Sequence, residues 1–149
     1  MEILLDTCSV LWFLNGDEKM STSAKDIILN AENTIYVSIA TVWEVAIKLS
    51  IEKLDFDGGI DGFIEAIEVE DFTLLEISSK HITKVANLPF IHRDPFDRML
   101  IAQAKTENIP IMTTDSEIPK YRNTTSKLFS NNRTHKKTSG QLGRSLFII

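Results

Sequence analysis

The chain is poor in cysteine and has no long apolar run, and both absences narrow its class. A single cysteine, Cys8, among 149 residues excludes a disulfide framework within the chain, and a reducing cytoplasm is the simplest setting. We expect Cys8 to be a small buried residue. No apolar run approaches the roughly 20 residues that span a membrane. Residues 1–6 lack the basic and apolar regions of a signal peptide. We therefore expect a cytoplasmic protein with no membrane partner.

Several chemical motifs are also missing. No glycine-rich loop precedes a helix, so nothing supports the cradling of a nucleotide. Position 14 is Leu, so Cys8 does not begin a Cys-x5-Arg phosphate loop, and Asp6-Thr7-Cys8 is not the Asp-x-Asp-x-Thr of aspartyl-phosphate phosphatases. The histidines show no metal-ligand spacing, and we expect His92 to orient the loop at Asp94 or to face solvent. The remaining candidates for chemistry are carboxylates.

Composition indicates one soluble globular domain, with 43% hydrophobic and 25% charged residues. The net charge of −5 hides an asymmetry, because all 21 acidic residues lie within residues 1–117 beside 9 Lys and Arg, a net of −12. Residues 118–149 carry 7 Lys and Arg and no acid. The body alone does not have the bulk charge of a nucleic-acid-binding protein, whereas the end of the chain does.

Short apolar segments alternate with helical patterns along the chain. We expect strands at about residues 2–6, 34–38, 72–77 and 109–114. We expect helices at about residues 9–14, 22–31, 42–49, 62–70, 79–88 and 95–107. This alternation predicts an α/β protein with a mainly parallel sheet. We place the domain at residues 1–121. Residues 122–149 are expected to form a basic, polar tail that is either irregular or non-native, and a non-native end is favoured over an extension that contacts RNA. Its last four residues are apolar enough to dock.

Four acidic residues lie where the apolar segments end or where helices begin: Asp6, Glu44, Asp97 and Asp115. A parallel sheet gathers such positions at the carboxyl edge of its strands, where ligands bind in this architecture. Carboxylates crowded there repel one another, and a hard divalent cation offsets that repulsion. One or two such ions could activate water and stabilise the leaving oxygen of a phosphodiester.

Each acid also has a structural interpretation. Asp6 could be only a turn residue at a strand end, and Glu44 could be a surface acid that pairs with Lys48 one helical turn later. Asp97 suits the positive end of a helix dipole, and Asp94 with Pro95 forms a helix start in which Asp94 is the cap. The joint pattern favours function more than any single member does.

At this point the sequence resembles a known family. The matching segments are residues 4–7, 37–48, 88–104 and 113–115, in order across about residues 2–121. The most specific is the stretch His-Arg-Asp-Pro-Phe-Asp-Arg at 92–98. These segments resemble PIN-domain proteins, and most closely the VapC-type toxins of bacterial type II toxin–antitoxin systems.

The resemblance implies a three-layer α/β/α sandwich and an endoribonuclease that depends on Mg²⁺ or Mn²⁺. It implies carboxylate ligands at the four acids named above, with Thr7, Thr113 and Asp94 in supporting places. It also implies a homodimer, an inhibitory antitoxin partner and a structured RNA substrate such as transfer RNA or ribosomal RNA.

One departure from the family pattern concerns the end of the chain. Relatives usually finish with a short strand soon after the segment that matches residues 118–121, whereas a polar basic tail follows here. If that strand is missing, one edge of the sheet lacks a partner. Two alternatives to a toxin nuclease remain: an inert PIN-like module that binds RNA or protein, and a Mg²⁺ phosphohydrolase that acts on small esters.

Overall fold

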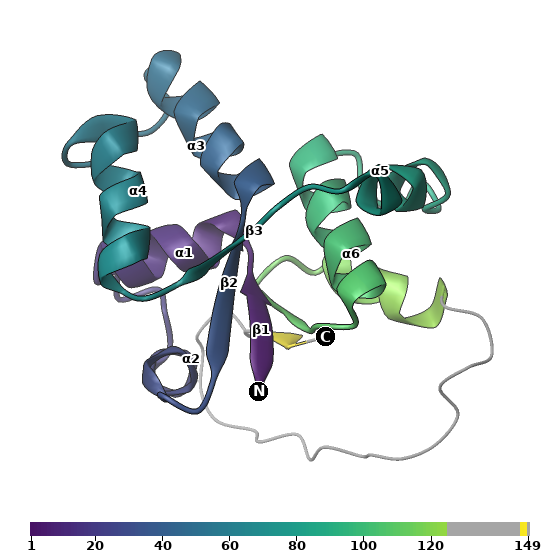
Figure 1. Ribbon diagram of the computed structural model, residues 1–149, viewed down its shortest axis with the longest axis horizontal. Coiled ribbons are helices and arrows are strands. Elements are labelled where there is room, and N and C mark those ends of the chain that lie inside the picture. Colours follow the sequence, from purple (N-terminus) through teal and green to yellow (C-terminus); the bar gives the residue numbers. More distant parts are fainter. Residues whose placement is uncertain (125–146, 149) are drawn as a thin grey trace.

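The computed structural model describes residues 1–124 and 147–148, and its centre is a sheet of five strands in the order β3-β2-β1-β4-β5 (Figure 1). The strands are β1 Glu2–Leu5, β2 Thr34–Ser38, β3 Thr73–Leu75, β4 Ile111–Thr113 and β5 Phe147–Ile148. The first four are parallel, and β5 runs antiparallel to β4. The central strand is β1, where Leu4 faces Tyr36 on one side and Ile111 on the other.

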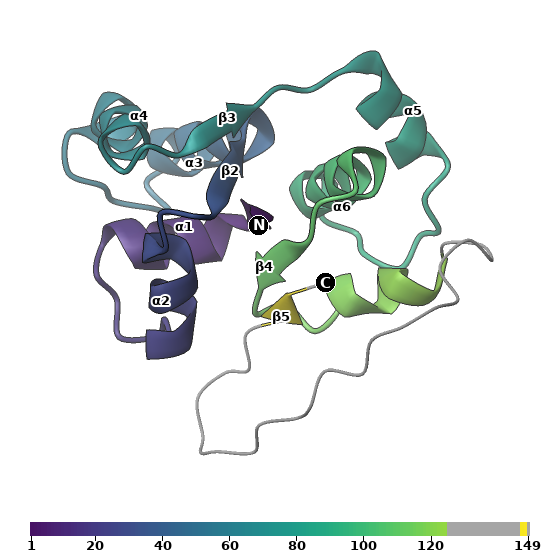
Figure 2. The ribbon, with the colours of Figure 1, turned by 60° about the horizontal axis from the view of Figure 1, so that its bottom comes forward.

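Helices cover both faces of this sheet. They are α1 Thr7–Leu14, α2 Thr22–Leu29, α3 Ile39–Ser50, α4 Gly59–Val69, α5 Ser79–Ala86 and α6 Pro95–Glu107, followed by the 3-10 helix η1 Ile118–Thr124. Figures 1 and 2 show α1 to α4 on one side of β1 and β2, with α5 and α6 on the other side. The predicted three-layer α/β/α sandwich with a mainly parallel sheet is therefore confirmed.

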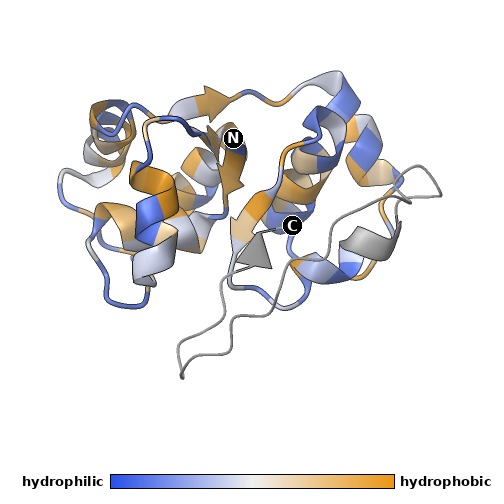
Figure 3. Ribbon diagram, turned by 90° about the horizontal axis from the view of Figure 1, so that it is seen from below, coloured by the Kyte–Doolittle hydropathy of each residue, from blue (hydrophilic) through white to orange (hydrophobic). Residues whose placement is uncertain are grey.

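The alternation of side chains along β1 builds the two cores. Ile3 and Leu5 belong to the cluster beneath α1 to α4, whereas Leu4 points the other way, into the cluster with Leu100 of α6. All three are fully buried. This is the period of two that a strand with both faces covered requires. The strands in the middle of the molecule are accordingly coloured as hydrophobic in Figure 3.

Local chemistry at the helix starts explains most of the boundaries. Ser38 caps α3 by accepting a hydrogen bond from the Ala40 N–H, so this helix begins three residues before the predicted position. Asp94 caps α6 and Pro95 occupies its first turn, as predicted. Asn108 ends α6 in the left-handed conformation with φ 58°.

One expectation concerns the C-terminal end. Because β5 pairs with β4, with Thr113 opposite Phe147, the final strand is present, and the condition under which this edge would be unpaired is not met. The predicted domain boundary after Tyr121 falls inside η1, and Tyr121 itself is buried. Most of the predicted tail at 122–149 lies outside the described residues.

Two further expectations concern membrane-spanning helices and the burial of Cys8. Among the described residues, no helix has the length and apolar character that crossing a membrane would need. The prediction of a buried Cys8 is wrong, because its side chain is exposed. Helix α1 turns Thr7, Ser9 and Val10 inward, which leaves the position of Cys8 on its outer side.

Candidate metal site

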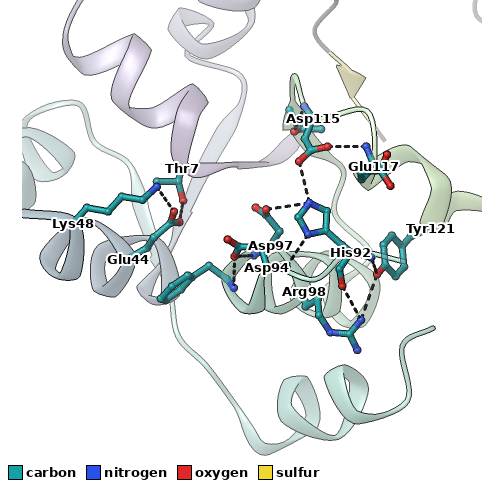
Figure 4. Close-up of polar contacts among 12 residues, drawn as sticks. Thr7, Glu44, Lys48, His92, Asp94, Asp97, Arg98, Asp115, Glu117 and Tyr121 are labelled. Carbon is teal, nitrogen blue, oxygen red and sulfur yellow. Dashed lines mark hydrogen bonds and ion pairs between the residues drawn. The ribbon is translucent and has the colours of Figure 1, made fainter. Parts of the chain in front are cut away.

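The parallel strands bring the predicted acids to one edge of the sheet. Asp6 follows β1 and Asp115 lies two residues after β4, and these strands are neighbours with the same direction. Glu44 comes from α3, which starts directly after β2, and Asp97 lies in the first turn of α6. Figure 4 shows the side chains of Glu44, Asp97 and Asp115 along this edge. The topology thus assembles residues that are separated by up to 109 positions in the chain.

The tightest group joins Asp97, Asp115 and a residue that the sequence did not predict as part of the site, His92. The Nε2 atom of His92 lies 3.0 Å from Oδ2 of Asp115 and 3.3 Å from Oδ2 of Asp97 (Figure 4). Potential ligand atoms of the three side chains all lie within 4.8 Å of one another. The predicted orienting role of His92 is confirmed as well, because its Nδ1 accepts a hydrogen bond from the Asp94 N–H at 3.1 Å.

Asp6 is the most deeply placed acid of the four. Its carboxylate caps α1 by accepting a hydrogen bond from the Ser9 N–H at 2.7 Å, and the Thr113 hydroxyl donates to it as well. Burial raises the pKa of Asp6 above its ordinary value despite these hydrogen bonds. The Thr113 oxygen also accepts from the Asp115 N–H at 2.9 Å. Thr113 therefore ties the acid after β1 to the backbone after β4.

Glu44 lies near this group but contacts other partners. One carboxylate oxygen accepts from the Thr7 hydroxyl at 2.5 Å, and the other lies 2.6 Å from the Lys48 ammonium. The pairing with Lys48 is the one that helical spacing predicts. Glu44 is only 7% exposed, so the Lys48 ammonium offsets the negative charge of a carboxylate that is shielded from water. The structure thus places Glu44 beside the other acids without bringing it into contact with them.

The acids at this edge of the sheet have shifted pKa values, because burial and their neighbours act on each carboxylate. Burial and the neighbouring carboxylates of Asp94, Glu44 and Asp6 raise the pKa of Asp97 from 3.8 to about 7, although His92 lowers it. Burial also acts to raise the pKa of Asp115, but hydrogen bonds from His92 and from the Glu117 N–H hold it below its ordinary value. A pKa of about 7 places the titration of Asp97 near neutral pH.

This donor set fits a hard divalent ion. Carboxylate and hydroxyl oxygens are the ligands that Mg²⁺ and Mn²⁺ prefer. A cation bound there would favour the ionised form of Asp97 and would offset the repulsion among the acids. The only donor of another kind in the group of three is the imidazole of His92.

No metal-ligand spacing in the sequence marks His92 as a member of this group. It lies 23 residues before Asp115, and metal-ligand spacing rules describe residues on one helix or one loop. Its place depends on how the loop before α6 packs against the end of β4. The one available signal was its position two residues before the helix cap Asp94.

The structure is an α/β/α sandwich that gathers carboxylates at the ends of its parallel strands. The PIN domain family model matches residues 3–123, and the chain belongs to the PIN-domain family. PIN domains are generally nucleases, and they typically use divalent metals.

Comparison with solved structures gives a fold match. The chain is similar to a chain in the crystal structure of VapBC2 from Rickettsia felis bound to a DNA fragment from their promoter. The TM-score is 0.64 and the identity 18%, and the match covers 83% of this chain and 95% of the other. At this identity the likeness supports a shared fold. No curated protein sequence matches the chain.

The raised pKa of Asp97 leads to a prediction for stability. A folded-state pKa of about 7 lies above the ordinary 3.8, so the folded protein binds a proton more tightly than the unfolded chain. That contribution to stability is fully present below about pH 4 and is lost as the pH rises through about 7. A bound Mg²⁺ would take the place of this proton, so added Mg²⁺ should raise the melting temperature more at about pH 8 than at about pH 5.5.

Differential scanning fluorimetry measures this shift. NaCl at matched ionic strength is the control, because it separates binding from general screening. Equal Mg²⁺ shifts at both pH values would show that Asp97 does not exchange a proton for the ion.

Proposed function

We propose that this protein is an endoribonuclease that depends on Mg²⁺ or Mn²⁺ and serves as the toxin of a type II toxin–antitoxin pair. The observation that carries the proposal is the set of crowded carboxylates at the sheet edge, where burial and the neighbouring acids raise the pKa of Asp97 to about 7. Membership of the PIN-domain family supports nuclease chemistry. The fold match to a protein described as part of VapBC2 supports an antitoxin partner.

In this proposal Asp6, Glu44, Asp97 and Asp115 hold the metal and form the catalytic set. The bound ion would supply an activated water and stabilise the charge on the leaving oxygen of the phosphodiester. Thr7 holds the Glu44 carboxylate, and Thr113 holds Asp6 relative to Asp115. Asp94 supports the set by fixing the first turn of α6, from which Asp97 projects.

Lys48 has a defined part in this arrangement. Its ammonium lies against Glu44, on the carboxylate oxygen that the Thr7 hydroxyl leaves free. A cation that recruits Glu44 therefore competes with Lys48 for the same carboxylate. Lys48 is 41% exposed, so once released it can remain in water at little cost in free energy.

RNA is the proposed substrate, and transfer RNA or ribosomal RNA are the candidates. The net charge of −12 on residues 1–117 opposes binding to phosphates, so the metal must offset part of it near the site. The remaining positive charge would come from the basic residues after position 117 or from a second subunit. Cleavage should accordingly weaken as the salt concentration rises.

A homodimer and an antitoxin are the proposed protein partners. One face of α3 supports an interface, because Trp43, Ile47 and Ile51 follow one another at helical spacing and are 61%, 37% and 52% exposed. Trp43 also meets Phe96 edge-on, with ring centroids 5.3 Å apart, so this apolar face reaches the start of α6. We propose the cytoplasm as the place where these partners meet.

A substrate panel tests the function. The purified protein, first stripped of metal, is incubated with structured RNA, single-stranded DNA and a small phosphate ester, each with Mg²⁺, Mn²⁺ or EDTA. We expect cleavage of RNA with either metal and none with EDTA. Turnover of the ester alone would indicate a small-substrate phosphohydrolase. RNA binding without cleavage would indicate an inert binding module.

A further inference from the structure

We propose that His92 is a positioning residue that holds Asp97 and Asp115 at the separation a metal ion needs, because its Nε2 N–H donates a hydrogen bond to Asp115 and lies within ion-pair distance of Asp97. In this arrangement His92 is not itself a metal ligand. The inference rests on the proposed function, because it concerns how the carboxylates of that same site are placed. It assigns a role to a residue outside the set of acids.

The hydrogen bonds of the ring fix its tautomer. Nδ1 of His92 accepts a hydrogen bond from the Asp94 N–H at 3.1 Å, so this nitrogen presents a lone pair. In the neutral ring the proton then sits on Nε2, which faces Asp97 and Asp115. A nitrogen that carries a proton has no lone pair for a metal. To become a ligand, His92 would have to move its proton to Nδ1, where it would meet the Asp94 N–H.

The two carboxylates that His92 joins belong to different elements. Asp97 projects from the first turn of α6, and Asp115 follows β4, 18 positions later in the chain. When both are ionised, the carboxylates of Asp97 and Asp115 repel each other, and a hydrogen-bond donor beside them reduces that repulsion. Nε2 of His92 forms a hydrogen bond with Oδ2 of Asp115 at 3.0 Å and lies 3.3 Å from Oδ2 of Asp97, so this ring nitrogen contacts both carboxylates. Each acid keeps a second oxygen that His92 does not occupy.

Buried groups anchor the backbone of His92 on both sides. Its N–H donates to the Tyr121 hydroxyl at 2.7 Å, and its carbonyl accepts from Arg98 at 3.4 Å. The Tyr121 hydroxyl in turn donates to the Pro89 carbonyl at 3.1 Å. Tyr121 is 1% exposed and Arg98 is 9% exposed, so these anchors are packed. The ring is therefore presented to the carboxylates from a fixed backbone, as a positioning residue requires.

Two substitutions of His92 test the contacts of Nδ1 and Nε2 separately. In His92→Asn the side-chain oxygen can take the place of Nδ1 and accept the Asp94 N–H, but no atom reaches the carboxylates. In His92→Gln the side-chain amide can donate from the position of Nε2. We expect Mn²⁺ affinity, measured by isothermal titration calorimetry, to fall about tenfold or more in His92→Asn. It should stay within about threefold of the unsubstituted protein in His92→Gln.

His81→Asn is the matched control. His81 is the other histidine among the described residues; it is buried, and its ring contacts the Ser78 N–H and the Glu107 carboxylate at the far end of α6. Its replacement should lower the melting temperature and leave Mn²⁺ affinity unchanged. A loss of affinity in His92→Asn then reflects the site and not general stability.

A measurement on the unsubstituted protein keeps the inference testable if a variant fails to fold. Pulsed electron paramagnetic resonance of bound Mn²⁺ detects a directly coordinated nitrogen, and we expect none. Nitrogen coordination, unchanged affinity in His92→Asn, or an equal loss in both variants would overturn the positioning role. Failure of the unsubstituted protein to bind Mn²⁺ would instead overturn the proposed function as well.

Discussion

Replacing Asp97 by Asn is expected to lower the rate of RNA cleavage roughly 100-fold or more, because metal-held charge stabilisation contributes several kcal/mol to such reactions. Asp97 lies at the centre of the cluster, since His92 contacts it and the charges of Asp94, Glu44 and Asp6 all act on it. An amide in its place is a weak ligand for a hard cation. Cleavage of a labelled structured RNA under Mg²⁺ measures the loss.

The same substitution should leave the metal-free fold intact or more stable. Burial and the neighbouring acids disfavour the charged form of Asp97, which is why its pKa rises to about 7. Asparagine resembles the protonated carboxyl in shape and carries no charge. Asp26→Asn is the matched control, because Asp26 is exposed on α2 and lies outside the cluster. Full activity in Asp97→Asn would contradict the assignment of this residue.

Replacing Arg98 by Ala is expected to cause the largest loss of stability, about 3 kcal/mol or more. Its buried guanidinium donates to the backbone carbonyls of Val85, Leu88, Pro89 and His92 and lies 3.4 Å from the Tyr121 hydroxyl. Without it these oxygens lose their donor, and each unsatisfied buried group costs about 1–3 kcal/mol. Thermal unfolding should show a melting temperature lower by roughly 6–12 °C.

Arg98→Lys is the comparison that isolates geometry from charge. An ammonium keeps the positive charge but cannot reach acceptors on several sides as the planar guanidinium does. We expect an intermediate loss of stability for this variant. A melting temperature unchanged in Arg98→Ala would show that the segment from the end of α5 to residue 92 does not depend on these contacts.

Sequence rules predicted the features that neighbouring residues determine. The cap Asp94 with Pro95 fixed the start of α6 and thereby the position of Asp97. The apolar segments located β1 and β2 closely, and their parallel pairing placed the acid at the end of β1 on the correct edge. These elements depend on local hydrogen bonds and on side-chain alternation, which a single sequence displays.

Features built from distant segments could not be predicted. His92 reaches Asp115 only because the loop before α6 packs against the end of β4, and no local pattern records that contact. Arg98 reads as an ordinary surface charge on a helix, although it is buried among carbonyls from the preceding loop. The pairing of β5 with β4 likewise joins segments 34 or more positions apart.

The most direct test of the central claim is the chemistry of the cleaved ends, measured with metal-stripped protein before and after Mg²⁺ is added back. When water is the nucleophile, cleavage needs no RNA 2′-hydroxyl, and the new phosphate end is a non-cyclic phosphate monoester. We expect such ends to appear with Mg²⁺, to be absent with EDTA and to be lost in Asp97→Asn. Metal-independent cleavage that leaves 2′,3′-cyclic phosphates would contradict the account, because the carboxylate cluster would then have no part in the reaction.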